Sequence, residues 1–404
     1  MSRLSKIVIL TTRGGEGLIS GSHAIRDALL QQDSELQIDI IDFFEGGGSL
    51  LGLMLTSFYN LLLRRSLLLN SVYIRLLHAM RLDRWKVLCG ATSRQFDRIV
   101  KEYRPDLIIV TSQYIIAPVC TARTEQAIQI PIIVANIDPA PPSSLLWFDQ
   151  RVDLHLLPTD EAVQSYTLAG MPIERATRVS MIVRDRFREA SCLKPVALLT
   201  ELGLNSELPL VLMSGSREGY SGMTNLLVRI LHETDSQVLI ICGTNTALRQ
   251  KLGVLTAAYG NRVQILGWRT DMERILRASD LVISKPGKQT MIESLATGTP
   301  LVAICYPAIM EQEQGNLVFL RNEGIAIEAT SENESIHLIN KILSDRPFAE
   351  KLRSKIRTSG DRHISAKAVA NAVTTFAESY SVAVRPPDKG KSNQPGMLAI
   401  QPRA

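Results

Sequence analysis

The chain has 404 residues, of which 45% are hydrophobic and 21% are charged, and its formal net charge is +5. This length allows two domains with separate cores, and the composition is that of a globular protein. The mildly basic balance is compatible with an anionic ligand or an anionic membrane surface, and it does not by itself indicate nucleic acid. The five cysteines and six histidines lack metal-ligand spacing. We therefore expect no metal site and no nucleic-acid partner.

The first half of the chain alternates apolar runs with helical stretches. The N-terminus leads from a few polar and basic residues directly into a short apolar run, which is not the pattern of a signal peptide. Strands are predicted at residues 7–11, 37–41, 107–111 and 132–135. This alternation predicts a Rossmann-like α/β domain over residues 1–190.

A segment within that half, residues 49–90, is rich in leucine, aromatic residues and arginine. Arg64 and Arg65 interrupt its apolar run after about fifteen residues, too few to span a bilayer. A basic, apolar and aromatic helix suits the interface of an anionic membrane. The alternative is a helical hairpin that packs on the protein core.

The second half repeats the alternation after a break in pattern near residues 188–195. Strands are predicted at residues 211–214, 238–242, 263–266, 281–283 and 301–304. We expect a second α/β domain over residues 191–380, whose last helix, about 365–380, returns to the first domain. Residues 381–404 are rich in Pro, Gly, Lys and Asn, so we expect a disordered tail.

Residues 283–316 are the most informative segment. An apolar strand runs into a loop with Pro286 and Gly287, and a helix is expected to start near Thr290. Such a loop, at the carboxyl end of a strand and the amino end of a helix, is where anionic ligands bind. Glu293 lies one turn after Thr290, so the hydroxyl and the carboxylate suit a phosphate and a ribose diol. The polar cluster at residues 311–313 follows the next strand and suits a sugar.

These motifs resemble the donor half of GT-B glycosyltransferases, in particular the monogalactosyldiacylglycerol synthases, the diacylglycerol glucosyltransferases and the peptidoglycan N-acetylglucosaminyltransferase. That family's motif reads roughly Thr-Lys-Pro-Gly-Gly-x-Thr-x-x-Glu-Ala-Leu, followed later by Pro-Gly-Gln-Glu-x-Gly-Asn. This chain has Ser-Lys-Pro-Gly-Lys-Gln-Thr at 284–290, Glu-Ser-Leu at 293–295, and matches in the second motif at 312–313 and 315–316. The resemblance implies a GT-B fold, with two Rossmann-like domains whose parallel sheets face each other across a cleft.

The resemblance also implies a donor site for a UDP-sugar. Relatives hold uracil with main-chain groups after an apolar strand and with an arginine at the domain junction, which correspond here to Gly267, Trp268 and Arg184. The phosphate loop corresponds to Ser214, Gly215 and Ser216. The sugar hydroxyls would contact Gln312 and Glu313, and either galactose or glucose suits that pair. The implied donor-binding residues are Arg184, Ser214, Gly215, Ser216, Gly267, Trp268, Gly287, Lys288, Gln289, Thr290, Glu293, Gln312, Glu313 and Asn316.

The first domain departs from the family where relatives carry histidines. The family's candidate base histidine falls on Leu18, which cannot accept a proton. Asp138 is the first candidate for a replacement base, since a carboxylate near an acceptor hydroxyl can take its proton. Glu16 is the second candidate. The alternative for Asp138 is a helix or turn cap beside Pro139.

The sequence therefore predicts an enzyme that moves a hexose from a UDP-sugar to a lipid hydroxyl of the diacylglycerol type, with inversion. No cofactor is expected, because the UDP-sugar is a co-substrate. We expect a cytoplasmic protein bound peripherally to an anionic membrane surface. Two alternatives stay open: transfer to another hydrophobic acceptor, or a non-catalytic nucleotide-sugar binding protein that has lost the family's base.

Overall fold

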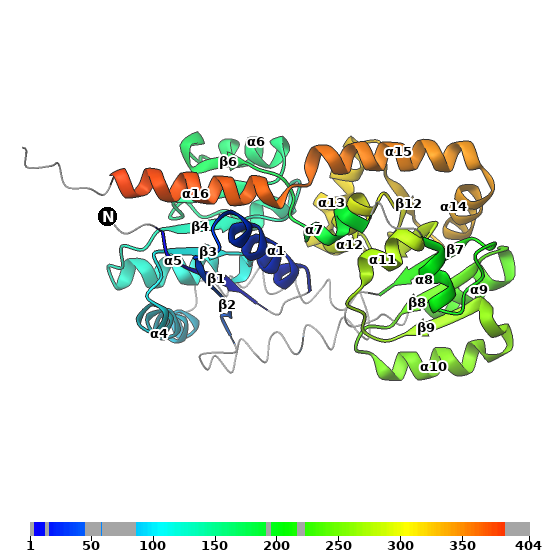
Figure 1. Ribbon diagram of the computed structural model, residues 1–404. Coiled ribbons are helices and arrows are strands. Elements are labelled where there is room, and N and C mark those ends of the chain that lie inside the picture. The colour runs from blue at the N-terminus through cyan, green and yellow to red at the C-terminus, as the bar shows by residue number, and fades with distance from the viewer. Residues whose placement is uncertain are drawn as a thin grey trace, which may run out of the picture.

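The protein is described by a computed structural model that covers residues 4–12, 16–44, 58, 86–190, 195–215 and 223–383. Its described residues form two α/β halves, each built on a six-stranded parallel sheet. Figure 1 shows the halves side by side, with a pair of long helices running along one edge of both. Each half has its own hydrophobic core.

The first sheet has the strand order β2-β1-β3-β4-β5-β6. Its inner strands are fully buried and continuously apolar, as expected where helices cover both faces of a parallel sheet. The strands are β1 (Lys6–Thr11), β2 (Gln37–Asp42), β3 (Leu107–Val110), β4 (Ile132–Ala135), β5 (Leu154–Leu157) and β6 (Ala176–Arg178). The helices are α1 (Glu16–Gln32), α4 (Lys86–Tyr103), α5 (Ile116–Glu125) and α6 (Asp160–Leu168), and the 3-10 turns are η2 (Gln113–Ile115), η3 (Ser143–Trp147) and η4 (Ile173–Arg175).

The second sheet has the order β12-β11-β10-β7-β8-β9. The strands are β7 (Leu210–Ser214), β8 (Gln237–Ile241), β9 (Val263–Leu266), β10 (Leu281–Ser284), β11 (Leu301–Ile304) and β12 (Ile327–Ala329). The helices are α7 (Asp185–Glu189), α8 (Pro195–Glu201), α9 (Met223–Glu233), α10 (Thr246–Thr256), α11 (Met272–Ala278), α12 (Lys288–Thr297), α13 (Glu311–Asn322), α14 (Glu332–Ser344) and α15 (Arg346–His363), with the 3-10 turn η6 (Ala257–Arg262).

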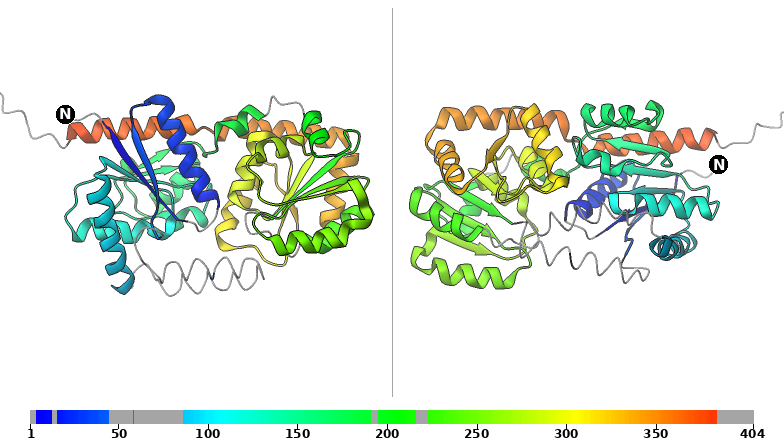
Figure 2. Two further views of the ribbon diagram at one scale, coloured as in Figure 1. Left: turned by 60° about the horizontal axis from the view of Figure 1, so that its bottom comes forward. Right: turned by 180° about the vertical axis from the view of Figure 1, so that it is seen from behind.

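The two halves are joined by two chain segments that run side by side. Met181 pairs with Ile364 as an isolated parallel bridge, and the Met181 amide donates to the His363 carbonyl at 2.7 Å. After α15, α16 (Ala366–Ala383) crosses back, and its Val369, Ala370 and Val373 side chains belong to the core of the first half. Figure 2 shows this course from two further sides. The predicted return of the last helix to the first domain is thus observed.

Most predicted elements are present, with small shifts of their ends. All nine predicted strands form, although β3 and β8 end one residue earlier than expected. Helix α12 begins at Lys288 rather than near Thr290, and α16 extends to Ala383 and so includes residues 381–383 of the expected tail. Strands β5, β6 and β12 were not predicted, since β5 contains His155 and β6 and β12 have only three residues each. The segment 49–90 lies outside the described residues except for Phe58 and the start of α4.

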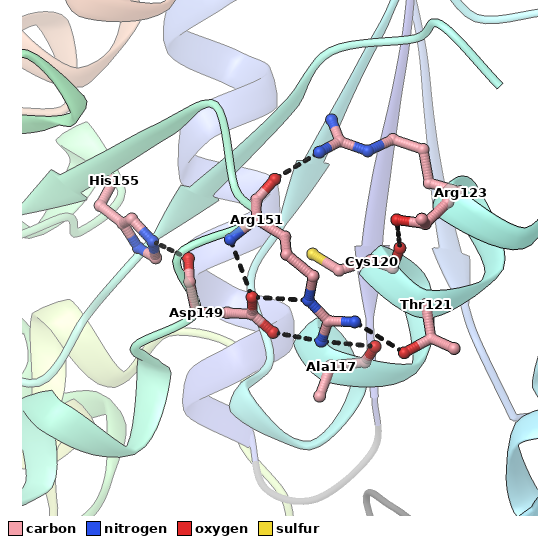
Figure 3. A network of polar contacts seen from close by, with 8 residues as sticks. Ala117, Cys120, Thr121, Arg123, Asp149, Arg151 and His155 are labelled. Carbon is pink, nitrogen blue, oxygen red and sulfur yellow. Dashed lines mark hydrogen bonds and ion pairs between the residues drawn. The ribbon is translucent and has the colours of Figure 1, made fainter. Parts of the chain in front are cut away.

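The unpredicted strand β5 is anchored at its amino end by a polar network. The Asp149 carboxylate accepts two hydrogen bonds from the Arg151 guanidinium, at 2.9 and 2.6 Å, and Arg151 also donates to Thr121 on α5 (Figure 3). The buried His155 ring bonds the Asp149 carbonyl through Nε2 at 3.0 Å. Burial lowers the pKa of His155 to about 4, so the ring is neutral at pH 7 and is tolerated inside the sheet. This network lies at the amino end of β5, whereas the candidate site lies at the carboxyl ends of the strands.

Candidate functional site

The second sheet reverses its strand order between β7 and β10, which lie next to each other. Ser214 ends β7 and is followed by Gly215, and Ser284 ends β10 and is followed by the loop to α12. In open α/β sheets, ligands bind outside the carboxyl ends of the strands at this reversal, because the two following helices lie on opposite faces. The topology therefore brings the two predicted phosphate-loop segments to one place. Ser216 lies outside the described residues.

The start of α12 offers donors and acceptors that the protein itself does not use. Gly287 is the N-cap and supplies no side-chain cap, so the first-turn amides have no capping side chain. Asn316 on α13 donates through Nδ2 to the Pro286 carbonyl at 2.8 Å. The buried Asn316 Oδ1 and Ser284 Oγ have no hydrogen-bond partner among the described residues. Unpaired buried polar atoms are costly, and a polar ligand at this loop would satisfy them.

Glu293 lies one turn farther along α12 and is held by its neighbour Gln289. The Gln289 amide donates to Glu293 Oε1 at 2.6 Å and to Ser20 Oγ of α1 at 3.2 Å. Burial raises the pKa of Glu293 to about 7, and the Gln289 hydrogen bond and the charges of Arg186 and Arg184 act in the opposite direction. Glu293 is therefore poised between its charged and neutral forms near neutral pH. Arg184, the N-cap of α7, lies within its electrostatic reach.

The amino end of α13 completes this side of the site. The Glu313 side chain is buried, and its Oε1 pairs with the Lys285 ammonium at 2.8 Å. A Cβ added to Gly287 would lie 3.7 Å from the same Glu313 oxygen, so α13 and the loop before α12 are in contact. Gln312 donates to the Met310 sulfur at 3.4 Å, while its buried Oε1 has no hydrogen-bond partner among the described residues.

Trp268 lies at the same end of the sheet, just after the carboxyl end of β9. The residue is 46% exposed. A Cβ added to the neighbouring Gly267 would lie 3.7 Å from the Gly243 carbonyl oxygen, which follows β8. The predicted base-binding pair is thus two strands away from β7, on the edge strand of the sheet.

The first half presents buried hydroxyls at its own point of reversal, between β1 and β3. Thr12 and Ser112, which follow these strands, bond each other at 2.8 Å, and Ser22 of α1 bonds Thr111 at 2.7 Å. Leu18, at the family's histidine position, lies on α1 and is buried in the core of the first half. Glu16 is the first residue of α1, and its side chain lies outside what the structure describes.

Asp138 follows β4 and is fully buried. Its Oδ2 accepts a hydrogen bond from Trp147 Nε1 at 2.6 Å, and its Oδ1 pairs with the Lys288 ammonium at 3.0 Å. Both described bonds of the carboxylate are to other side chains, so Asp138 does not act as the turn cap that was the alternative. Instead, a carboxylate of the first half is bound to the first residue of α12 in the second half.

The two halves touch at two further points around this pair. Gly17 of α1 faces Gln289, since a Cβ there would lie 3.6 Å from the Gln289 Cβ. The Gly315 amide of α13 donates to Ser143 Oγ at 3.2 Å, and a Cβ at Gly315 would overlap Ser143 and the Ala140 carbonyl. The candidate site is therefore bordered by both halves of the molecule.

Two family profiles match the chain, one in each half. Residues 20–180 match monogalactosyldiacylglycerol (MGDG) synthase, and residues 224–373 match the C-terminal domain of glycosyltransferase family 28. Both matches fall on the sheets whose reversal points border the site. The chain is a glycosyltransferase of the GT-B fold. The predicted fold class and family resemblance are confirmed.

Sequence relatives of this glycosyltransferase agree with that assignment. It is 25% identical over 273 residues to the processive diacylglycerol beta-glucosyltransferase of Bacillus subtilis, covering 68% of this chain and 69% of the relative. It is 22% identical over 371 residues to the protein of the same name from Bacillus pumilus, covering 90% and 94%. It is 28% identical over 363 residues to the chloroplastic monogalactosyldiacylglycerol synthase 1 of Arabidopsis thaliana, covering 85% and 65%.

Solved structures share the fold of this glycosyltransferase at low sequence identity. Anabaena HepE in complex with UDP and glucose has a TM-score of 0.58 at 15% identity, covering 93% of this chain and all of that one. A putative UDP-N-acetylglucosamine 2-epimerase from Listeria monocytogenes has a TM-score of 0.60 at 14% identity, covering 95% and 98%. At this identity, the likeness establishes the two-domain fold alone.

The part of the glycosyltransferase that the structure describes contains no group of three or more His, Cys, Asp or Glu side chains arranged to hold a metal ion. Within the same residues, no helix combines the length and apolar character needed to cross a bilayer.

Sequence reasoning assigned no site role to three residues of this region, namely Ser20, Trp147 and Lys285. Lys285 lies inside the motif, and its pairing with Glu313 follows only when β10 and α13 are placed in space. Ser20 and Trp147 reach the site from the first half through Gln289 and Asp138. Spacing alone predicts neither contact, because Ser20 is more than a hundred residues from Gln289 and the contact of Trp147 with Asp138 depends on the path of η3.

Proposed function

We propose that this glycosyltransferase moves a hexose from a UDP-sugar to the hydroxyl of a diacylglycerol-type lipid, with inversion. The observation that carries the donor half is the gathering of the motif residues at the β7/β10 reversal, with Glu293 one turn into α12. The lipid acceptor is proposed from the names of the relatives, which are diacylglycerol glucosyltransferases and a galactolipid synthase.

Each donor residue has a proposed role. The Glu293 carboxylate accepts hydrogen bonds from the ribose hydroxyls, and Thr290 bonds a phosphate. The exposed Trp268 ring stacks on uracil beside Gly267, with Arg184 at the domain junction. The diphosphate is bound by main-chain groups at the start of α12 and after β7, within Ser214, Gly215, Ser216, Gly287, Lys288 and Gln289. The sugar hydroxyls are bound by Gln312, Glu313 and Asn316.

The transfer step requires a base and a stabilised leaving group. The acceptor oxygen attacks the anomeric carbon of the sugar as its proton passes to a carboxylate. The bond between the anomeric carbon and the β-phosphate oxygen breaks, and UDP leaves with the electron pair. Preorganised amides and cations at the phosphates stabilise the charge that develops there, which is usually the largest catalytic contribution.

Asp138 is the proposed base, with Glu16 as the second candidate. A base must come within about 2.6–3.2 Å of the proton it removes. Because Asp138 is fully buried behind Lys288 and Trp147, the acceptor can reach it only after these side chains or the two halves move. The proposal therefore requires an opening motion before the acceptor binds.

Membrane association is a separate proposal that rests on composition. The segment 49–90 would bind the surface of an anionic membrane through its arginines and leucines. Replacing Arg64, Arg65 and residues 61–63 with polar residues should release the protein from anionic vesicles in a flotation assay. Unchanged flotation would contradict this role and favour a segment packed on the core.

The decisive experiment measures UDP release from a panel of UDP-sugars, with vesicles that contain diacylglycerol and with matched vesicles that lack it. Release that depends on diacylglycerol would support the proposal and identify the donor sugar. Release with other hydrophobic acceptors only would favour a different lipid or metabolite. Binding without any release would favour a nucleotide-sugar binding protein, which the buried Leu18 at the family's base position makes the specific competing candidate.

A further inference from the structure

Lys288 departs from the motif that this chain otherwise matches. The motif has two glycines in succession, and here the second is replaced by lysine. Lys288 is the first residue of α12, where the helix dipole makes a positive charge unfavourable. A lysine at this position therefore requires a compensating anion.

Asp138 provides that anion from the other half of the protein. The Lys288 ammonium lies 3.0 Å from Asp138 Oδ1 and 5.2 Å from the centre of the Trp147 ring, while the Lys288 side chain is only 18% exposed. Trp147 in turn donates to Asp138 Oδ2. Two groups, Asp138 and Trp147, thus fix the ammonium, and a buried carboxylate without its counter-charge would be costly.

The ammonium is positioned for a second anion. An ammonium has three N–H donors, and Asp138 accepts the single hydrogen bond that Lys288 makes through Nζ to the residues described. Lys288 opens the first turn of α12, which has no side-chain cap, and the loop before this turn holds the unpartnered buried Ser284 Oγ and contacts Asn316, whose buried Oδ1 also has no partner among the described residues. These atoms are independent signs of a polar ligand at this turn.

We propose that Lys288 is a ligand of the donor diphosphate, and that Asp138 positions its ammonium across the boundary between the two halves. This inference rests on the proposed donor site. The ammonium would neutralise charge on the β-phosphate as UDP leaves. Because its anchor belongs to the first half, this neutralisation is complete only when the two halves are in contact.

Calorimetry with uridine and UDP separates a phosphate ligand from a simple contact between halves. Uridine lacks the phosphates, so Lys288→Met should leave uridine affinity unchanged and weaken UDP binding by about tenfold or more, as for a lost charge-assisted bond. Lys288→Arg keeps the charge and should retain most of the UDP affinity. Lys341→Met is the matched control, because Lys341 lies over the Phe348 ring on the outer helices of the same half.

Two results would overturn the inference. An equal loss of uridine and UDP affinity in Lys288→Met would make Lys288 a contact between halves, and unchanged UDP affinity would remove it from the site. Failure of the wild-type protein to bind either compound would instead contradict the proposed donor site as a whole. Melting temperatures of each variant separate loss of binding from loss of folding.

The role of Asp138 has its own test. As the anchor of Lys288, Asp138→Asn should weaken UDP binding, and the double variant Asp138→Asn, Lys288→Met should bind UDP about as weakly as Lys288→Met alone. If Asp138 served only as the base, Asp138→Asn would lower turnover and leave UDP affinity intact. That result would remove the positioning role while leaving the proposed reaction in place.

Discussion

The two reversal points of the molecule are built in different ways. At the second sheet, several of the proposed ligand-binding groups, including Ser284, Gly287 and Glu293, come from one continuous segment. At the first sheet, small buried hydroxyls that bond one another follow β1 and β3, and Asp138, after β4, is paired with Lys288 of the other half. The proposed donor site thus rests largely on a local motif, whereas the surroundings of Asp138 depend on how the halves meet.

Replacing Gly315 tests the contact between the two halves, and it should lower sugar transfer more than any other substitution considered below. A Cβ there would overlap Ser143 and the Ala140 carbonyl, so Gly315→Ala must separate α13 from η3. Displacements of about 1 Å in an active site can reduce turnover by roughly 100-fold. We expect a loss of that order in sugar transfer, measured as UDP release.

Gly253→Ala is the matched control, since Gly253 lies in α10 and a Cβ there meets no atom within 4 Å. It should preserve transfer and raise the free energy of unfolding by roughly 0.5–1 kcal/mol. Full activity in Gly315→Ala would show that transfer does not need this approach of the two halves.

Glu293 tests the donor side alone. Glu293→Ala should weaken UDP binding by roughly 1–3 kcal/mol, because the ribose hydroxyls lose their acceptor. Calorimetry with UDP and with its 2′,3′-dideoxy analogue should show that the variant no longer distinguishes the two. Continued discrimination between them would contradict the ribose assignment.

A change of pH should alter UDP affinity less than Glu293→Ala does. Since burial raises the pKa of Glu293 to about 7, the carboxylate that accepts the ribose hydroxyls is lost as pH falls through 7. UDP affinity should therefore decrease several-fold between pH 8 and pH 6, and Glu293→Gln should flatten this dependence. A wild-type profile identical to that of Glu293→Gln would contradict the role of this titration.

The same pKa shift has a consequence for folding. A carboxyl group with a raised pKa in the folded state favours the neutral form, so its contribution to the free energy of unfolding falls as pH rises from the ordinary glutamate value through 7. Glu293→Gln should therefore gain stability relative to the wild type above pH 7. Thermal unfolding at pH 6 and pH 8 measures this difference.

The sequence alone determined the features that depend on local pattern. The apolar strands, the α12 loop with its glycine N-cap and the donor motif are encoded over a few neighbouring residues, because strand burial and helix capping are set at that range. Strands β6 and β12, with three residues each, are too short for periodicity to be informative, and buried His155 in β5 contradicts a simple apolar pattern.

Only the tertiary structure decided which distant residues face one another. Strand order places Ser214 beside Ser284, and the meeting of the halves places Asp138 against Lys288 and Ser143 against Gly315. Sequence spacing does not predict such pairs, since each residue fits the pattern of its own helix or loop whether or not the distant partner is present. They form because a buried charge needs a counter-charge and a buried amide needs an acceptor, and the fold determines which ones are within reach.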